Sequence, residues 1–337
     1  MKMLDLFSGI GGFHKGFEEV GFEFDWVGFS EIDKYASAVY KYRYPDAEEL
    51  GDITSIRPER DLPDNIDLLC GGFPCQAFSV AGRRKGFEDT RGTLFFEIAR
   101  ILRHFRDTEK PIPYFVLENV KGLLSHDDGR TFAIIYRVLT DIGYTVECQL
   151  LNTRWVLPQN RERIYIVGHF GRGSGCKVFP IGESGGVAYN RNTEVASTLQ
   201  HPGHSGGNYK GMNMIDTGLK QVKAVITPDR KEKRQNGRRM KEDGEPMFTL
   251  NAQDQHGVMV REATKKGYAD RKTAIRRLTP IECMRLQGFP DDWNEKGIMD
   301  GKVVNMSDTQ RYKQAGNAVS VPIVSMVAER IKNAKQK

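Results

Sequence analysis

The 337-residue sequence lacks the features of a membrane or secreted protein. No stretch approaches the roughly 18 consecutive apolar residues that a membrane-spanning helix needs, and residues 1–7 lack the apolar core of a secretory signal. The five cysteines are an odd number, are widely spread and include no Cys-x-x-Cys pair, which argues against a disulfide framework and a structural zinc site. We therefore expect a cytoplasmic protein with reduced thiols, no membrane association and no bound metal.

Charge is nearly balanced but unevenly distributed. Lys and Arg total 50 against 44 Asp and Glu, a net charge of +6. Residues 220–277 alone contain 16 Lys and Arg and 8 Asp and Glu, so the rest of the chain is slightly acidic. A basic segment on such a body indicates a polyanion binder. A solvated loop region would show the same charge run, and the count alone does not separate the two interpretations.

Short apolar runs and helical patterns alternate through the first half of the chain. Strands are predicted at residues 3–7, 24–29, 66–70, 114–117, 144–151 and 164–167, with helices over residues 13–20, 35–40, 94–105 and 131–142. This alternation predicts an α/β fold with a doubly wound, mostly parallel sheet, Rossmann-like in class.

The composition changes near residue 171, where a Gly- and Ser-rich stretch opens a polar, basic region with only short strand-like runs. Thr279 and Pro280 then begin a helix that ends near residue 288, and a last helix covers residues 319–331. We predict a catalytic and cofactor-binding domain over residues 1–179 plus 306–337, and a smaller loop-rich recognition domain with its hinge over residues 180–305.

A glycine-rich turn, SGIGG at residues 8–12, follows the first predicted strand. Such a turn lets the backbone approach a ligand closely, and Glu31, at the end of the next strand, is placed to accept hydrogen bonds from ribose hydroxyls. The glycine spacing departs from G-x-G-x-x-G, which favours S-adenosylmethionine over a nicotinamide cofactor. Asp52 and Ile53, before the third strand, are predicted to contact the adenine.

Cys75 follows the third strand directly, on a loop expected at the same sheet edge as the glycine turn. Nearby basic residues could lower its pKa so that it reacts as a thiolate, although most free cysteines are buried and structural. We predict that buried structural role for the other four, Cys70, Cys148, Cys176 and Cys283.

From this stretch onward the chain resembles the bacterial and phage cytosine-5 DNA methyltransferases of restriction–modification systems. The resemblance spans nearly the whole chain through seven motifs in the family's order. These are residues 5–12 (DLFSGIGG), 72–79 (GFPCQ with FS), 86–95 (GFEDTRGTLF), 117–120 (LENV), 158–163 (PQNRER), 277–283 (RLTPIEC) and 316–319 (GNAV).

The resemblance implies a mechanism for methyl transfer to cytosine. The Cys75 thiolate attacks carbon 6, which makes carbon 5 nucleophilic, while Glu118 supports the developing charge on ring nitrogen 3. Arg161 and Arg163, two apart on an extended segment, hold the base carbonyl and steady Glu118 or a phosphate. The cofactor pocket is predicted to comprise Phe7, Ser8, Gly9, Ile10, Gly11, Gly12, Glu31, Ile32, Asp52, Ile53, Gly72, Pro74, Leu94, Asn317 and Val319. Ile32 stands where relatives often carry Trp, which predicts less stacking on the adenine.

The implied substrate is duplex DNA, from which the enzyme must flip the target cytosine. The predicted DNA-contacting residues are Gln76, Ser79, Arg83, Arg84 and Lys85 on a closing loop, and Gln200, Thr249, Gln253 and Gln255 in the recognition domain. We expect a nucleoid-associated monomer, with a restriction endonuclease of the same site as a possible partner. The alternatives are a tRNA cytosine-5 methyltransferase, a non-catalytic DNA-binding regulator and, least favoured, a nicotinamide oxidoreductase.

Overall fold

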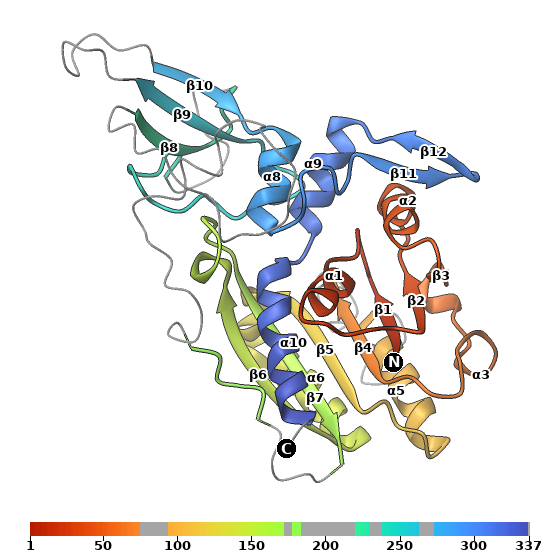
Figure 1. Cartoon of the computed structure of the whole chain (residues 1–337). Coiled ribbons are helices and arrows are strands. Elements are labelled where there is room, and N and C mark those ends of the chain that lie inside the picture. Colours follow the sequence, from red (N-terminus) through yellow and green to blue (C-terminus); the bar gives the residue numbers. More distant parts are fainter. Residues whose placement is uncertain (75–93, 172–176, 183–219, 230–237, 263–272, 336–337) are drawn as a thin grey trace.

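The computed structural model describes residues 1–74, 94–171, 177–182, 220–229, 238–262 and 273–335 (Figure 1). Cys176, whose structural role was predicted from the sequence, lies outside these ranges. In the part of the chain that is described, no helix is long and apolar enough to cross a bilayer.

A seven-stranded sheet forms the larger part of the molecule, in the order β3-β2-β1-β4-β5-β7-β6. Its strands are β1 (Lys2–Leu6), β2 (Trp26–Ser30), β3 (Glu48–Glu49), β4 (Leu68–Gly72), β5 (Tyr114–Val120), β6 (Tyr144–Asn152) and β7 (Glu162–Phe170). The first five in sequence pair in parallel, whereas β7 runs antiparallel to both β5 and β6. The predicted α/β fold with a mostly parallel sheet is therefore confirmed.

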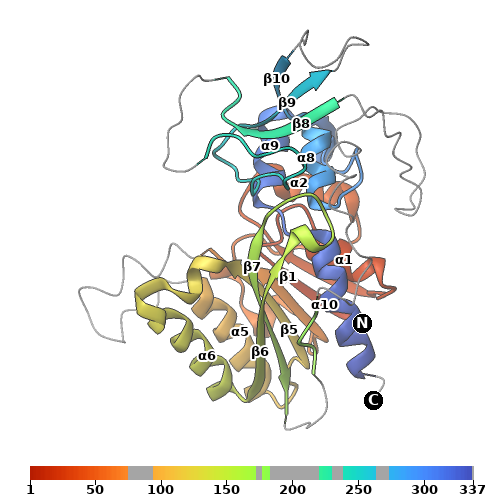
Figure 2. The same ribbon diagram turned by 90° about the vertical axis from the view of Figure 1, so that its left-hand side faces the viewer.

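Helices cover both faces of this sheet, so the molecule has three layers here (Figure 2). They are α1 (Gly12–Glu19), α2 (Lys34–Arg43), α3 (Pro58–Asp61), α5 (Leu94–Asp107), α6 (Arg130–Ile142) and α10 (Val321–Lys335). Short 3-10 turns connect them at η1 (Ile53–Ser55), η4 (Lys121–Leu124), η5 (His126–Gly129) and η6 (Thr153–Trp155).

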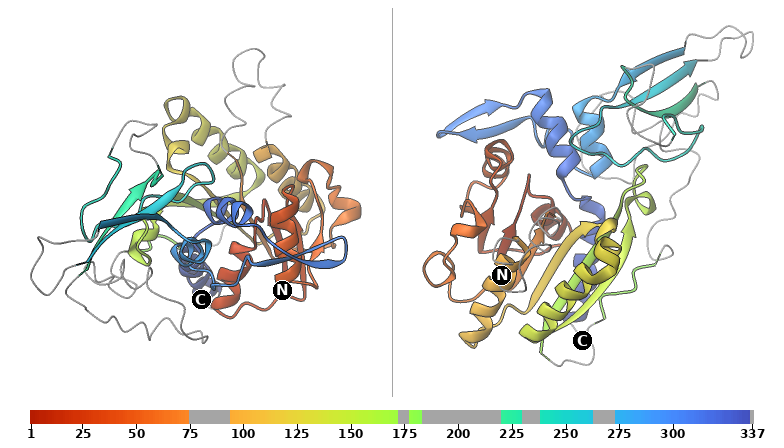
Figure 3. Two further views of the ribbon diagram at one scale, coloured as in Figure 1. Left: turned by 90° about the horizontal axis from the view of Figure 1, so that it is seen from above. Right: turned by 180° about the vertical axis from the view of Figure 1, so that it is seen from behind.

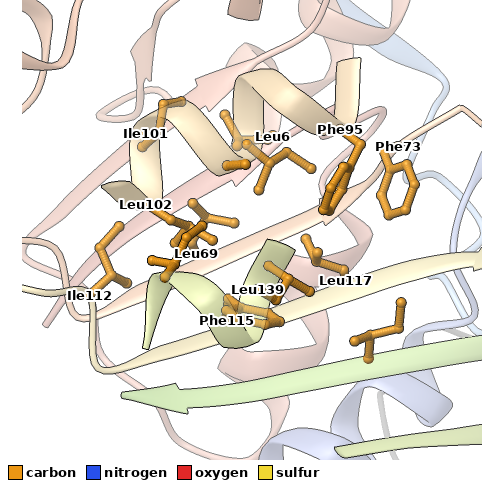
Figure 4. Packing of buried hydrophobic residues seen from close by; sticks show 14 of the residues in the cluster. Leu6, Leu69, Phe73, Phe95, Ile101, Leu102, Ile112, Phe115, Leu117 and Leu139 are labelled. Atoms are coloured by element: carbon orange, nitrogen blue, oxygen red, sulfur yellow. The ribbon is translucent and has the colours of Figure 1, made fainter. Parts of the chain in front are cut away.

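Alternating residues of the central strands divide the core between the two faces, as the two-residue period of a strand requires. Leu6, Leu69 and Leu117 pack with α5 and α6 (Figure 4). The neighbouring residues Cys70 and Val116 pack on the opposite side with α1 and α10. Because both faces are covered, these strands read as continuous apolar runs in the sequence.

A second, antiparallel sheet lies beyond the carboxyl edge of the first, in the order β10-β9-β8 (Figures 1 and 3). Its strands are β8 (Lys220–Ile226), β9 (His256–Glu262) and β10 (Thr273–Arg277). Three further elements, α8 (Pro280–Gln287) and the hairpin of β11 (Lys296–Met299) and β12 (Lys302–Asn305), lead into α9 (Asp308–Asn317). The predicted cap is confirmed, since the Thr279 hydroxyl accepts from the Glu282 N–H and the Glu282 carboxylate accepts from the Thr279 N–H.

A third apolar cluster joins the two parts of the molecule. It unites Ile10 and Val39 of the large part with Val258 of the second sheet and with Met284 and Leu286 of α8. The hairpin contributes too, because the Cα of Gly297 lies so close to Ala38 of α2 that a Cβ there would touch its backbone at 3.0 Å. The two parts therefore share one continuous core at their junction.

Three details differ from the sequence-based expectations. The basic region contains a regular three-stranded sheet rather than only short strand-like runs, because β9 pairs along its length with both β8 and β10. The last helix, expected from residue 319, starts at Val321, and Asn317 does not lead into it directly but ends a separate helix, α9. Cys148 is exposed on the edge strand β6, so its predicted burial is wrong, whereas Cys70 and Cys283 are buried as expected.

Candidate active site

The turn after β1 is built for close approach of a ligand. Gly9 and Gly11 have φ values of +55° and +86°, a left-handed region that favours glycine, and Phe7 shares it at +53°. The Gly9 N–H donates to Glu31 Oε2 at 2.8 Å, and the Asp33 N–H donates to Oε1 at 2.8 Å. Burial raises the pKa of Glu31. The turn and the carboxylate at the end of β2 are thus held together as one unit.

A cavity of about 520 Å³ opens above this unit, at the carboxyl ends of the parallel strands. Eleven of the residues predicted to bind the cofactor line it, namely Phe7, Gly9, Ile10, Glu31, Ile32, Asp52, Ile53, Gly72, Pro74, Leu94 and Asn317. This is the edge where open α/β sheets bind their ligands. The structure thus brings together residues that are up to 310 positions apart in the sequence.

Four residues predicted for the pocket are not among those that line the cavity: Ser8, Gly11, Gly12 and Val319. Gly12 packs directly on the Val319 side chain, where an added Cβ would come within 3.0 Å of it. Gly11 lies against the rings of Tyr40 and Tyr44, and the Ser8 side chain is buried. Ser8, Gly11 and Gly12 therefore belong to the part of the turn that packs on the core, and Val319 supports the turn there.

The residues that line the cavity fit S-adenosylmethionine in their chemistry. No atom lies within 4 Å of the point where a Cβ of Gly9 would sit, so the turn leaves room for a ligand. The Glu31 carboxylate has lone pairs left for ribose hydroxyls, since each of its oxygens accepts one backbone N–H. Ile32 is 78% exposed at the cavity, in position to pack on a flat ring. The Asp52 side chain caps η1 by accepting from the Thr54 N–H.

The candidate catalytic carboxylate, Glu118, lies on the wall of the same cavity. Its Oε1 is 3.0 Å from Nε of Arg163, and both side chains are largely buried. The next residue, Asn119, donates through Nδ2 to the Phe73 carbonyl at 2.8 Å. The end of β5 is thereby tied to the segment that leads into Cys75. Six of the predicted site residues lie outside the described ranges along with Cys75 itself: Gln76, Ser79, Arg83, Arg84, Lys85 and Gln200.

Arg161 differs from Arg163 in its surroundings, although both line the cavity. Only 3% of Arg161 is exposed. Its guanidinium donates to three backbone carbonyls, those of Leu250 at 2.9 Å, Gly316 at 3.3 Å and Ala318 at 2.8 Å. Burial lowers the pKa of Arg161 to about 10, and the neighbouring Arg163 adds to this effect. Most of its donors are therefore engaged within the protein, and Arg163 is the arginine beside the carboxylate.

Three predicted DNA contacts fall within the described residues, on either side of Leu250, whose carbonyl accepts from Arg161. The Thr249 hydroxyl donates to the Asn160 carbonyl. Gln253 and Gln255 are exposed on a loop whose turn is closed by Asn251, which accepts from the N–H groups of Gln253 and Asp254. The side chains of Gln253 and Gln255 are therefore accessible to a ligand, whereas the Thr249 hydroxyl already donates to Asn160.

Some cavity residues were missed in the sequence. Lys313 and Gln314 line the cavity from α9; Lys313 Nζ is 2.5 Å from Asp33 Oδ2, and Gln314 donates to the Tyr35 carbonyl. The sequence could have indicated both residues, because they lie within one helical turn of the GNAV motif. Asp33 could have been found as the helix cap that follows Glu31, since it accepts from the N–H groups of Tyr35 and Ala36.

Comparison with known proteins agrees with this geometry. The family model of C-5 cytosine-specific DNA methylases matches residues 1–333. The chain is 32% identical to the orphan methyltransferase M.SPRI of Bacillus phage SPR, over 97% of this chain and 96% of that protein. It is 38% identical to the type II methyltransferase M1.ScrFI of Lactococcus lactis subsp. cremoris, over 100% and 79%.

Among solved structures, the S. pombe Dnmt2 methyltransferase has the same fold, with a TM-score of 0.68 at 19% identity, covering 100% of both chains. The methyl donor of this family is S-adenosylmethionine, the cofactor that the cavity fits. The match to the family model over nearly the whole chain, together with these relatives, shows that the protein belongs to the C-5 cytosine-specific DNA methylases, enzymes that methylate cytosine in DNA.

Proposed function

We propose that this chain methylates cytosine within one short sequence of duplex DNA, using Cys75 as the nucleophile. The observation that carries the proposal is the Glu118–Arg163 ion pair at 3.0 Å in the same cavity as the Gly9–Glu31 unit. A carboxyl group and a guanidinium there face the ring atoms of a base, while the glycine turn holds the cofactor.

Each residue then has a defined task. The Cys75 thiolate forms a bond to carbon 6, and the electron pair of the 5,6 double bond becomes available at carbon 5. In its protonated form the Glu118 carboxyl donates a hydrogen bond or its proton to ring nitrogen 3, where negative charge develops. Arg163 holds Glu118 and the base carbonyl. The electrophilic methyl group comes from bound S-adenosylmethionine, which leaves as S-adenosylhomocysteine. A water molecule then takes the carbon 5 proton, and the electron pair of that C–H bond re-forms the 5,6 double bond and expels Cys75 as a thiolate.

Arg161 is assigned a positioning role in this scheme rather than contact with the base, because its donors are used by Leu250, Gly316 and Ala318. Gln253 and Gln255 are proposed to contact DNA from their exposed loop. The loop that carries Gln76, Ser79 and residues 83–85, like Gln200, keeps its predicted DNA contacts as part of the proposal. The domain division at residues 179/180 and 305/306 is likewise proposed, with the shared core as the junction.

The decisive experiment is bisulfite sequencing of plasmid DNA from cells that express this chain or its Cys75→Ala variant. We expect protected cytosines in one short sequence context, and none with the variant. Methyl transfer to tRNA but not to the plasmid would favour the tRNA alternative, whereas protection that persists in Cys75→Ala would contradict the mechanism. Binding of a nicotinamide dinucleotide in place of S-adenosylmethionine would contradict the cofactor assignment.

We further propose that the protein is a cytoplasmic, nucleoid-associated monomer. It either belongs to a restriction–modification system with a partner endonuclease or is an orphan enzyme without one. Both kinds of protein occur among the relatives. Light scattering of the 38.2-kDa chain tests the monomer. Once the methylated site is known, resistance of the modified plasmid to a host endonuclease of that site tests for the partner.

A further inference from the structure

Two glutamines form a buried joint that links the segment around Leu250 and helix α8 to α9, which lines the cofactor cavity. Gln159 precedes β7 and Gln287 ends α8, and both side chains are 0% exposed. A buried amide is costly unless its donors and acceptors are paired. Full burial of two amides at one junction therefore points to a defined set of hydrogen bonds.

Those bonds connect four segments that are distant in the sequence: the residues before β7, the segment around Leu250, α8 and α9. Gln159 Oε1 accepts from the Leu250 N–H at 2.9 Å, and its Nε2 donates to the Leu286 carbonyl at 2.7 Å. Gln287 Nε2 donates to the Ala315 carbonyl at 2.8 Å. The two side chains are also within 3.4 Å of each other, from Nε2 of Gln159 to Oε1 of Gln287. The segment before Leu250 is fixed as well, because Met247 pairs in parallel with Gln159.

The joint brings the loop of residues 251–255 onto the cavity wall. Gly316 touches the peptide between Asn251 and Ala252 so closely that an added Cβ would lie within 3.0 Å of its backbone atoms. Gly316 and Asn317 both line the cofactor cavity. A displacement of this wall must therefore move the backbone of the loop that carries Gln253 and Gln255.

We propose that Gln159 and Gln287 are positioning residues that couple occupancy of the cofactor cavity to DNA binding by the loop of residues 251–255. The inference rests on the proposed function, in which this loop contacts DNA. The amides hold Leu250 on one side and Ala315 on the other, so the loop and the cavity wall move as one body. Such coupling is reciprocal: cofactor tightens DNA binding by the same factor by which DNA tightens cofactor binding.

The test compares two dissociation constants of S-adenosylhomocysteine, measured by calorimetry without and with a short duplex that carries the site found by bisulfite sequencing. Their ratio is the coupling factor, and about fivefold or more is expected for the wild type. Gln287→Met keeps the side-chain length but removes the amide, and should bring the ratio below about twofold. Its affinity for S-adenosylhomocysteine alone should stay near the wild-type value, because Gln287 does not line the cavity.

Gln149→Met is the matched control. Gln149 also bridges two segments through its amide, donating to the Ile181 carbonyl and accepting from the Ile181 N–H, but it belongs to β6 and does not line the cavity. This variant should keep the wild-type coupling factor. If Gln287→Met does not fold, judged by its urea midpoint, Gln159→Met tests the same joint.

A coupling factor of one in a wild-type enzyme that methylates plasmid DNA would overturn this inference and leave the proposed function intact. Wild-type coupling retained in folded Gln287→Met or Gln159→Met would also overturn it. Loss of coupling in Gln149→Met as well would show a general effect of lost stability and would count against the joint. Failure of the proposed function is recognised separately, as absence of protected cytosines with the wild-type chain.

Discussion

Arg161 and Arg163 are two residues apart, yet the structure predicts opposite consequences for their removal. Replacing Arg161 by Leu would leave the carbonyls of Leu250, Gly316 and Ala318 without their guanidinium donors. A buried acceptor that loses its donor costs about 1 kcal/mol at the low end of the measured range, so the three together lower the free energy of unfolding by ~3 kcal/mol. With an m-value of about 3 kcal/mol per molar urea, the midpoint falls by ~1 M.

Arg163→Leu is expected to affect chemistry instead. Glu118 loses its partner, but it lines an open cavity where water can replace the guanidinium, so the free energy of unfolding falls by only ~1 kcal/mol. Methyl transfer should fall about a hundredfold or more, the usual contribution of a positioned acid–base group.

Urea unfolding followed by tryptophan fluorescence, and tritiated methyl transfer per mole of folded enzyme, measure the two effects in parallel. Arg161→Lys serves as the conservative variant. It keeps the charge, but a single ammonium cannot reproduce the fork that reaches three carbonyls, so most of the stability loss should persist. An unchanged midpoint in Arg161→Leu, or equal loss of methyl transfer in both Leu variants at equal stability, would refute the division of roles.

Three further outcomes are expected. Ile32→Trp should bind S-adenosylmethionine about 2- to 10-fold more tightly by calorimetry, because a ring at the 78% exposed position adds stacking on the adenine; weaker binding would contradict this placement of the adenine. Glu31→Gln should weaken that binding about tenfold or more and leave DNA binding without cofactor unchanged, since charged acceptors make the stronger hydrogen bonds. Burial lowers the pKa of both His14 and His256 to about 4, so these two residues make the free energy of unfolding fall as the pH is lowered from about 6.5 toward 4. The buried acids Asp5 and Glu31, whose pKa burial raises, act in the opposite direction. The test is therefore a difference: urea titrations of His256→Phe should lose less stability between pH 6.5 and 4 than the wild type does, and an identical pH profile would exclude His256 as a source.

The large sheet could be predicted because its central strands are buried on both faces and because glycines end or follow several of its strands, as at β1, β4 and β7. Helix α9 and the β11–β12 hairpin were not predicted from the sequence. Helix α9 is strongly polar along its length, and the pattern of apolar residues that marks a helix is nearly absent from it. The β11–β12 hairpin could have been predicted from the Asp-Gly pair at its turn. Asp300 and Gly301 both have positive φ there, and Asp-Gly favours such turns.

The site was predictable where its residues directly follow neighbouring strands of the predicted sheet, as Gly9 and Glu31 do. It was not predictable where the partner comes from a distant segment. The side chain of Lys313 reaches the cavity only because α9 packs beside α2, and the carbonyls that engage Arg161 lie 89 to 157 residues further along the chain. The spacing of Arg161 and Arg163 predicts that both side chains lie on the same side of the strand. It does not predict which of the two is buried by distant segments of the chain.

The way α9 and α10 return to the first strands has a consequence for the order of events during synthesis. The turn at residues 8–12 leaves the ribosome before α9 and α10. Yet Gly12 packs on Val319, Gly16 of the following helix packs on Val324, and the cavity includes Asn317. A ribosome-bound chain that has completed the second sheet therefore still lacks one wall of its cofactor site and one of the helices that cover its large sheet. We expect a chain that stops before Asn317 neither to bind cofactor nor to methylate DNA.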